Sequence, residues 1–167
     1  MSDIHIILTG GTIEKTYDPL TEKPELRQSS VVPDYLKDIV KIYPDVSFNN
    51  ISQIDSVDMN DQVRSDIVKS ISQCSARSVI IIHGTSTMEV TAQFILSHMG
   101  DIDKTIVLTG SMIPLKEFAM SDGGFNLGYA IAQSQNAESG VYVAMNACLF
   151  DAGDVTKDTS IGRFAST

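Results

Sequence analysis

The stretch HIILTGGTIEK, from His5 to Lys15, joins a run of apolar residues to two glycines that stand between threonines. Four of the five residues at 4–8 are apolar, which is typical of a strand buried on both faces. Glycines permit a tight turn and let other groups approach the backbone closely. The stretch therefore predicts a buried strand whose carboxyl end carries an exposed hydroxyl.

Further apolar runs follow this strand along the chain. Strands are expected at 78–83, 104–110 and 140–146, and the looser alternation at 45–52 predicts one more. Apolar residues also recur at helical spacing, at 31–43, 60–74, 87–99 and 124–135. Strands that alternate with helices in this way predict an α/β fold with a mostly parallel sheet covered on both faces.

The length, composition and charge of the chain limit the class of protein that it can be and the partners that it can have. The chain has 167 residues, one domain's length, and its apolar fraction of 43% is ordinary for a globular protein. Its net charge is −9 and its pI about 4.6, which disfavours nucleic acid and anionic membranes as partners.

The cysteines and the first residues bear on location. Cys74 and Cys148 lie in apolar stretches outside any CxxC motif, which predicts reduced core residues. The residues after Met1 do not resemble a secretory signal, and no apolar run approaches the roughly 20 residues of a membrane-spanning helix. We therefore expect a soluble cytoplasmic protein.

The segment 14–30 differs from the rest of the chain. It is polar, contains two prolines and has no hydrophobic period. Long ordered loops are uncommon unless they have a function, so a mobile lid over a site is one interpretation. A plain solvated loop is the other.

Three of the predicted strands end in related residues: ILTGGT, IIIHGTST and IVLTGSM. Ligands of open parallel sheets bind beyond the carboxyl ends of the strands, so these hydroxyls are expected to share a crevice. Helix capping is the alternative for any one of them. No phosphate-loop motif occurs, and His5, His83 and His98 are too scattered for a metal cluster. No metal or cofactor is predicted, and His83 is expected to be a satisfied strand-end residue.

An alcohol needs activation before it attacks a carbonyl at neutral pH. The sequence offers no evident histidine–carboxylate pair for this purpose. A lysine can act as the base where burial favours its neutral form. Lys157 follows the last strong strand and is a candidate on position alone.

Six motifs together resemble the bacterial-type asparaginase family, in the same order along nearly the whole chain. They are TGGTI (9–13), DSVDMND (55–61), HGTSTMEVTA (83–92), VLTGSMIP (107–114), SDGGFNL (121–127) and FDAGDVTK (150–157). The resemblance implies a flavodoxin-like, three-layer N-terminal domain with a left-handed crossover near the site. Pattern alone would favour the common right-handed connection.

The resemblance also implies site residues and a reaction. Thr12 matches the first nucleophilic threonine, Thr85 the second catalytic threonine, and Lys157 the lysine that activates it. Tyr17 is the candidate lid tyrosine, although it lies closer to Thr12 than the family spacing suggests. The implied reaction is amide hydrolysis through an acyl-enzyme. The implied substrate-binding residues are Gly11, Ser56, Val57, Gly84, Ser86 and Ser111.

The chain departs from the family at the substrate's ammonium group. Ser86 stands where the family has aspartate, and Val57 where many members have glutamine. The family's second, smaller domain is expected to be absent, since 1–167 covers only the N-terminal domain. These departures predict a carboxamide substrate whose α-amino group is missing or masked, or weak binding of L-asparagine.

Two alternatives remain open at this point. The chain could be a non-catalytic module that binds a small amide or carboxylate, or one half of a two-chain enzyme. A homodimer or higher homo-oligomer is expected, because the helical stretches 87–99 and 124–135 are rather apolar for full exposure.

Overall fold

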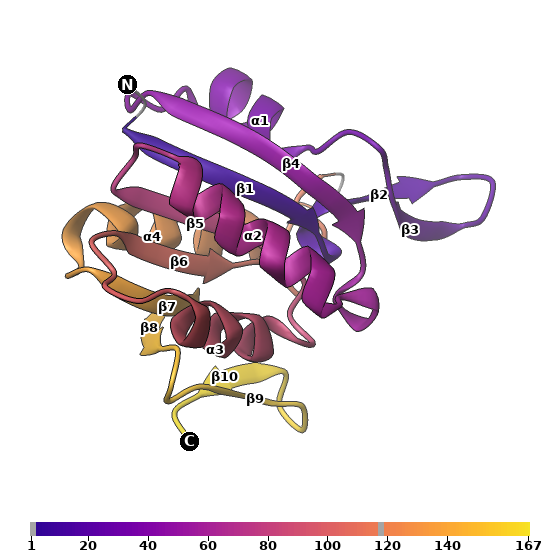
Figure 1. Ribbon diagram of the computed structural model, residues 1–167. Helices are drawn as coiled ribbons and strands as arrows, with labels where there is room; N and C mark the ends of the chain where they lie inside the picture. The colour runs from indigo at the N-terminus through magenta and orange to yellow at the C-terminus, as the bar shows by residue number, and fades with distance from the viewer. Residues whose placement is uncertain (1–2, 117–118) are drawn as a thin grey trace.

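The computed structural model describes residues 3–116 and 119–167 (Figure 1). Its centre is a six-stranded sheet in the order β4-β1-β5-β6-β7-β8. The first five strands in this order run parallel, and β8 pairs antiparallel with β7. The strands are β1 (Ile4–Gly10), β4 (Val46–Ile54), β5 (Ser78–Ile82), β6 (Thr105–Thr109), β7 (Gly140–Met145) and β8 (Cys148–Asp151). The predicted α/β fold with a mostly parallel sheet is confirmed.

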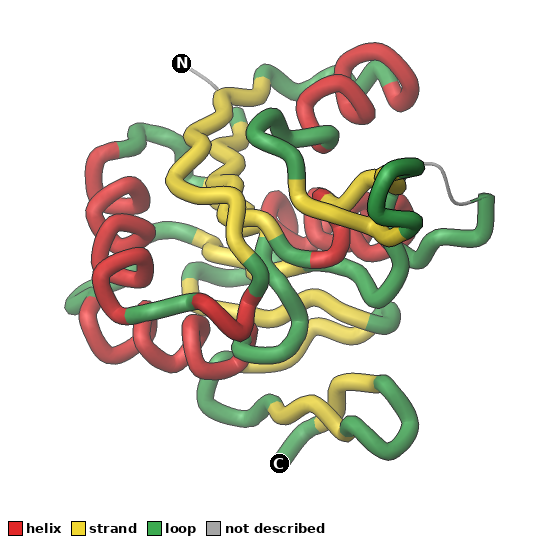
Figure 2. Tube along the Cα trace, turned by 90° about the vertical axis from the view of Figure 1, so that its right-hand side faces the viewer, coloured by secondary structure: helices red, strands yellow, loops and turns green. Residues whose placement is uncertain are grey.

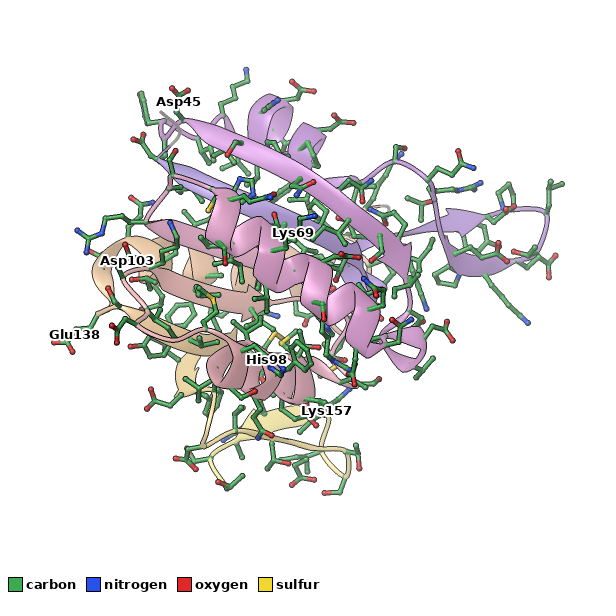
Figure 3. The ribbon with its side chains drawn as sticks, viewed as in Figure 1. Asp45, Lys69, His98, Asp103, Glu138 and Lys157 are labelled. Atoms are coloured by element: carbon green, nitrogen blue, oxygen red, sulfur yellow. The ribbon has the colours of Figure 1, made fainter. Side chains whose placement is uncertain are left out.

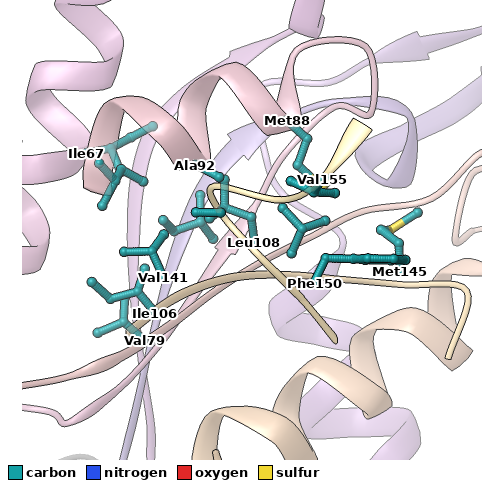
Figure 4. Close-up of a cluster of buried hydrophobic side chains, with 14 of the residues drawn as sticks. Ile67, Val79, Met88, Ala92, Ile106, Leu108, Val141, Met145, Phe150 and Val155 are labelled. Carbon is teal, nitrogen blue, oxygen red and sulfur yellow. The ribbon is translucent and has the colours of Figure 1, made fainter. Parts of the chain in front are cut away.

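Helices cover both faces of this sheet, which gives three layers (Figures 1 and 2). On one face lie α2 (Asp61–Gln73) and α3 (Met88–His98), whose apolar side chains pack on the sheet in one buried cluster (Figure 4). On the other face lie α4 (Gly123–Asn136) and the short α1 (Val32–Asp34) with a second cluster. A π-helical turn, Tyr35–Val40, continues α1.

Local sequence explains where α2 begins. The Asn60 side chain accepts a hydrogen bond of 3.1 Å from the Val63 amide and so caps the first turn. Ile67 and Ile71, four residues apart, are fully buried against the sheet. The helix predicted at 60–74 is confirmed.

The crossover through α4 has an unusual hand. The connections β5-α3-β6 and β6-α4-β7 both advance one strand in the same direction across the sheet, but α3 and α4 lie on opposite faces. The two connections must therefore have opposite hands. The α3 connection is right-handed in the view of Figure 1, so the α4 connection is the rare left-handed one. The crossover implied by the family resemblance is confirmed.

Two hairpins stand outside the central sheet. Within 14–30, β2 (Lys15–Asp18) and β3 (Lys23–Leu26) form an antiparallel pair that projects from the body of the fold (Figure 1). The segment is therefore a hairpin and not an irregular loop, and its movement as a lid stays a prediction. Near the C-terminal end, β9 (Thr156–Asp158) pairs with β10 (Arg163–Ala165), a hairpin that periodicity did not predict.

The cysteines differ from expectation in part. Both are free thiols, and Cys74 packs against the buried cluster on the α2 face. Cys148 is exposed, because it opens the edge strand β8, so its expected place in the core is wrong. No helix within the described residues has the length and apolarity to cross a membrane.

Candidate functional site

The carboxyl ends of β1, β4 and β5 meet in direct backbone contact. A Cβ atom on Gly11 would lie 2.4 Å from the Gly84 amide nitrogen, and one on Gly84 would lie 2.5 Å from the Ser56 Cβ. Gly11 has φ of +84°, a conformation that glycine adopts without strain. The turns that carry Thr12, Thr85 and Ser56 are therefore in contact with one another.

Thr85 and Lys157 are joined although 72 residues separate them. The Lys157 Nζ donates a hydrogen bond of 2.8 Å to the Thr85 Oγ1. Thr85 is only 5% exposed, and Lys157 is half-buried on β9, the first strand of the C-terminal hairpin, near α3 (Figure 3). The Met112 Sδ lies 3.6 Å from the same hydroxyl oxygen. An amine and an alcohol thus share a hydrogen bond at the edge of the sheet.

Ser56 is fixed in this site through its backbone and its side chain. Its hydroxyl oxygen accepts from the Ser86 amide at 3.1 Å, and its carbonyl accepts from the Thr87 hydroxyl at 2.8 Å. Because the Ser56 oxygen accepts, its own proton can still be donated to a ligand. Val57 and Ser86 beside it are exposed, Val57 by 72%. Neither side chain carries a carboxylate.

Thr12 begins a short 3-10 turn, Thr12–Glu14, directly after β1 and is half-buried. It follows Gly11, whose backbone touches Gly84, and Gly84 precedes Thr85. The two threonines thus start from adjoining backbones. The Gly11 amide itself donates to the Ile54 carbonyl at 2.9 Å and is used within the fold.

Glu14 is a buried carboxylate that the sequence did not single out. It accepts from the Ser30 hydroxyl at 2.6 Å and from the Val31 amide at 2.8 Å. Burial raises the pKa of Glu14, against the opposing effect of these donors. The carboxylate holds together the two ends of the segment that carries β2 and β3.

Lys15 and Asp55 connect that hairpin to the Ser56 turn. The Lys15 Nζ lies 2.7 Å from the Asp55 Oδ2, and this hydrogen bond lowers the pKa of Asp55. Asp55 immediately precedes Ser56. The base of the hairpin is therefore tied to the turn that holds Ser56, a candidate substrate-binding residue.

His83 is confirmed as a satisfied strand-end residue. A carbonyl can only accept, so His83 Nδ1 is protonated and donates to the Gly84 oxygen at 2.7 Å. Its Nε2 accepts from the Thr91 hydroxyl at 2.9 Å, and Thr91 accepts from Arg64 Nε at 3.1 Å. Burial lowers the pKa of His83 to about 4, so the ring is neutral. Arg64 and Thr91 were not among the predicted site residues. Through His83 they support the turn at Gly84.

The two remaining candidates are Tyr17 and Ser111, and Ser111 directly precedes Met112, whose Sδ lies near the Thr85 hydroxyl. Tyr17 is on β2 of the projecting hairpin and is 44% exposed. Ser111 is fully buried and its hydroxyl donates to the Ile113 carbonyl at 2.5 Å, which accounts for it within a turn. Their roles in substrate contact stay predictions. Within residues 3–116 and 119–167, no three His, Cys, Asp or Glu side chains group to hold a metal ion.

Comparison with known proteins gives consistent matches. The family model described as "Asparaginase, N-terminal" matches residues 3–165. L-asparaginase 2 of Escherichia coli is 35% identical over 99% of this chain and 50% of its own length. The glutaminase-asparaginase of Acinetobacter glutaminasificans is 34% identical over 98% of this chain and 52% of its own. The crystal structure of L-asparaginase I from Vibrio cholerae superposes with a TM-score of 0.85 at 25% identity, over 99% of this chain and 51% of that one. The chain thus spans about half the length of the relatives it matches.

Proposed function

The chain belongs to the asparaginase family, and on this basis we propose that it hydrolyses a side-chain carboxamide to a carboxylate and ammonia through a threonine nucleophile. The observation that carries the proposal is the 2.8 Å hydrogen bond between Lys157 Nζ and Thr85 Oγ1. A lysine on a threonine hydroxyl, beside a second threonine on a glycine turn, is suited to activating an alcohol.

The proposed steps use three side chains. The Thr12 oxygen adds to the amide carbonyl carbon, while its proton passes through Thr85 to the amine of Lys157. The C–N bond then breaks, the nitrogen takes this proton from Lys157 and leaves as ammonia, and the acyl group remains on Thr12 as an ester. Water cleaves this ester, giving the carboxylate and free Thr12.

The oxyanion of each tetrahedral intermediate needs backbone donors. The Gly11 amide already donates to Ile54, so we assign this role to the amides of Thr12 and Thr85. A donor of this kind is worth about 3 kcal/mol in the transition state. Ser56, whose proton is available, holds the substrate's carboxylate in this proposal.

The substrate is proposed to lack a free ammonium group. The exposed Val57 and Ser86 flank Ser56 and offer no charge to pair with one. Turning over succinamate or N-acetyl-asparagine faster than L-asparagine would support this assignment. A strong preference for L-asparagine would contradict it.

The proposal is tested by ammonia release from these amides. We expect Lys157→Met to lower kcat by about 100-fold or more, as loss of a general base does. Thr12→Ala should abolish hydroxamate formation when hydroxylamine intercepts the ester. Lys69→Met on the exposed face of α2 and Thr156→Ala beside Lys157 are the controls. A wild-type protein that binds these amides without releasing ammonia would instead be a binding module.

Location and assembly stay predictions. We propose a cytoplasmic protein that acts on a small amide as a homodimer or larger homo-oligomer. The exposed apolar side chains of α3 and α4 support self-association.

A further inference from the structure

Asn146 lies in the two-residue turn between β7 and β8 and reaches the C-terminal hairpin. Its backbone has φ of +56°, and its side-chain Oδ1 accepts a hydrogen bond of 3.1 Å from the Phe164 amide. Phe164 is the central residue of β10. The turn conformation explains why asparagine is tolerated here, but it does not require the bond to Phe164.

The strand pairing carries this bond to the candidate site. Phe164 stands directly opposite Lys157 in the antiparallel pair of β10 and β9. Lys157 in turn donates to the Thr85 hydroxyl at 2.8 Å. One side-chain hydrogen bond and one cross-strand pair therefore separate Asn146 from the amine of the site.

Asn126 of α4 holds the Asn146 turn in place. It is almost fully buried, its Oδ1 accepts from the Asn146 amide at 3.2 Å, and its Nδ2 donates to the Gly110 carbonyl at 3.1 Å. A Cβ on Gly110 would lie 2.2 Å from the His83 carbonyl oxygen. These contacts therefore form a continuous path. It begins at His83 at the end of β5, passes through Asn126 of α4 and the C-terminal hairpin, and returns to Thr85.

We propose that Asn146 is a positioning residue that sets where Lys157 stands relative to Thr85, an inference that rests on the proposed function. A two-stranded hairpin is marginally stable by itself, so β9 and β10 depend on their attachments. The buried Phe164 and Val155 side chains supply an attachment, but apolar burial has no preferred direction. The hydrogen bond that the Phe164 amide donates to Asn146 supplies that direction, and it aligns the strand opposite Lys157.

Two substitutions separate this role from the turn conformation. Asn146→Gly keeps a positive φ but removes the acceptor, whereas Asn146→Asp keeps an oxygen at the same place. Asn49→Ala is the control, because it removes a hydrogen bond of 2.7 Å to Ser70 far from the hairpin. Circular dichroism and urea unfolding at matched temperature check that each variant is folded.

The first measurement is the rate at which an acylating reagent modifies the Lys157 amine, followed by peptide mass spectrometry and normalised to the exposed Lys69. We expect Asn146→Gly to raise this rate about threefold or more, because local opening of the hairpin releases the amine from Thr85. Asn146→Asp and Asn49→Ala should stay near the wild-type rate. Equal rates for all four proteins would overturn the proposal.

The second measurement is amide hydrolysis. We expect Asn146→Gly to lower kcat about tenfold or more with little change in KM, since a displaced base costs rate and not binding. Asn146→Asp should recover most of the loss, and equal losses in both Asn146 variants would overturn the positioning role. If the wild-type protein hydrolyses none of the amides, the proposed function fails, and the labelling of Lys157 decides the positioning role alone.

Discussion

The Thr91 hydroxyl donates a hydrogen bond of 2.9 Å to Nε2 of the fully buried His83. The neutral ring carries its proton on Nδ1, so Nε2 can only accept and Thr91 supplies the proton, while the Thr91 oxygen accepts from Arg64. His83 is thereby held neutral, with its other nitrogen donating to Gly84. Protonating the ring would turn Nε2 into a donor, take away the acceptor of the Thr91 proton and leave a charge in the core.

We predict that stability falls as pH falls because of His83. Its pKa is about 4 in the fold against an ordinary value of 6.5, so the unfolded chain binds more protons between these values. The stabilisation is complete above pH 6.5 and is lost as pH drops toward 4, by about 3 kcal/mol at most. Urea unfolding at a series of pH values measures this slope.

The control for this slope is His83→Asn, which cannot titrate. The variant should be less stable at pH 7 but should lose less stability on acidification than the wild type. His5, whose pKa burial also lowers, contributes equally to both proteins. Parallel curves for the two proteins would show that His83 does not titrate in this way.

Gly11→Ala should disrupt the contact between the turn after β1 and the turn after β5. The new Cβ would meet the Gly84 backbone at 2.4 Å, and the φ of +84° would be strained. We expect a loss of about 2–4 kcal/mol in the free energy of unfolding. Gly128→Ala is the matched control, because nothing lies within 4 Å of its Cβ and it should gain up to about 1 kcal/mol in α4. A fully stable Gly11→Ala protein would mean that the two turns can separate.

Glu14→Ala should loosen the β2-β3 hairpin. Without the carboxylate, the Val31 amide and the Ser30 hydroxyl lose a buried acceptor, which costs about 1–3 kcal/mol. Trypsin should then cleave after Arg27 faster than in the wild type, as followed by mass spectrometry. Glu25→Gln on β3 should leave the cleavage rate unchanged. Unaltered cleavage in Glu14→Ala would show that the Glu14 contacts do not hold the hairpin.

Self-association should depend on the exposed apolar residues of the helices. Val90 and Leu96 on α3 and Phe125 on α4 are each about half exposed or more, Phe125 by 61%. We expect Leu96→Glu or Phe125→Glu to shift the wild-type oligomer toward monomer in sedimentation velocity. The helices lie on opposite faces, so the variant that acts identifies the face. A monomeric wild-type protein at high concentration would refute the expected oligomer.

The central sheet and its helices could be predicted because their signals are strong and local. Continuous apolar runs such as 78–83 and the stripe through Ile67 and Ile71 have few other solutions. The two hairpins could not be predicted in this way. Their strands are only three or four residues long and show no sustained apolar run, and tertiary contacts such as that between Glu14 and Ser30 hold one of the hairpins.

The residues of the candidate site could be proposed from the sequence more readily than the contacts between them. Position at strand ends placed Thr12 and Thr85 together and made Lys157 a candidate, but only the resemblance assigned Lys157 its role. Nothing local in the sequence indicates that β9 brings Lys157 back to Thr85, or that Asn146 holds β10. Such long-range pairs depend on how the C-terminal hairpin docks, and periodicity carries no information about docking.

The fixed ends of segment 14–30, which carries β2 and β3, have a consequence for engineering. Because Glu14 meets Ser30 and Val31, the chain leaves the body of the fold and returns to it at nearly the same point. A foreign peptide of different length could therefore be grafted between Lys15 and Ser30, which keeps the Lys15–Asp55 ion pair, with little effect on the sheet and at an entropic cost that grows only slowly with length. The β2-β3 hairpin can then be exchanged for other sequences while the central sheet and its helices keep their fold.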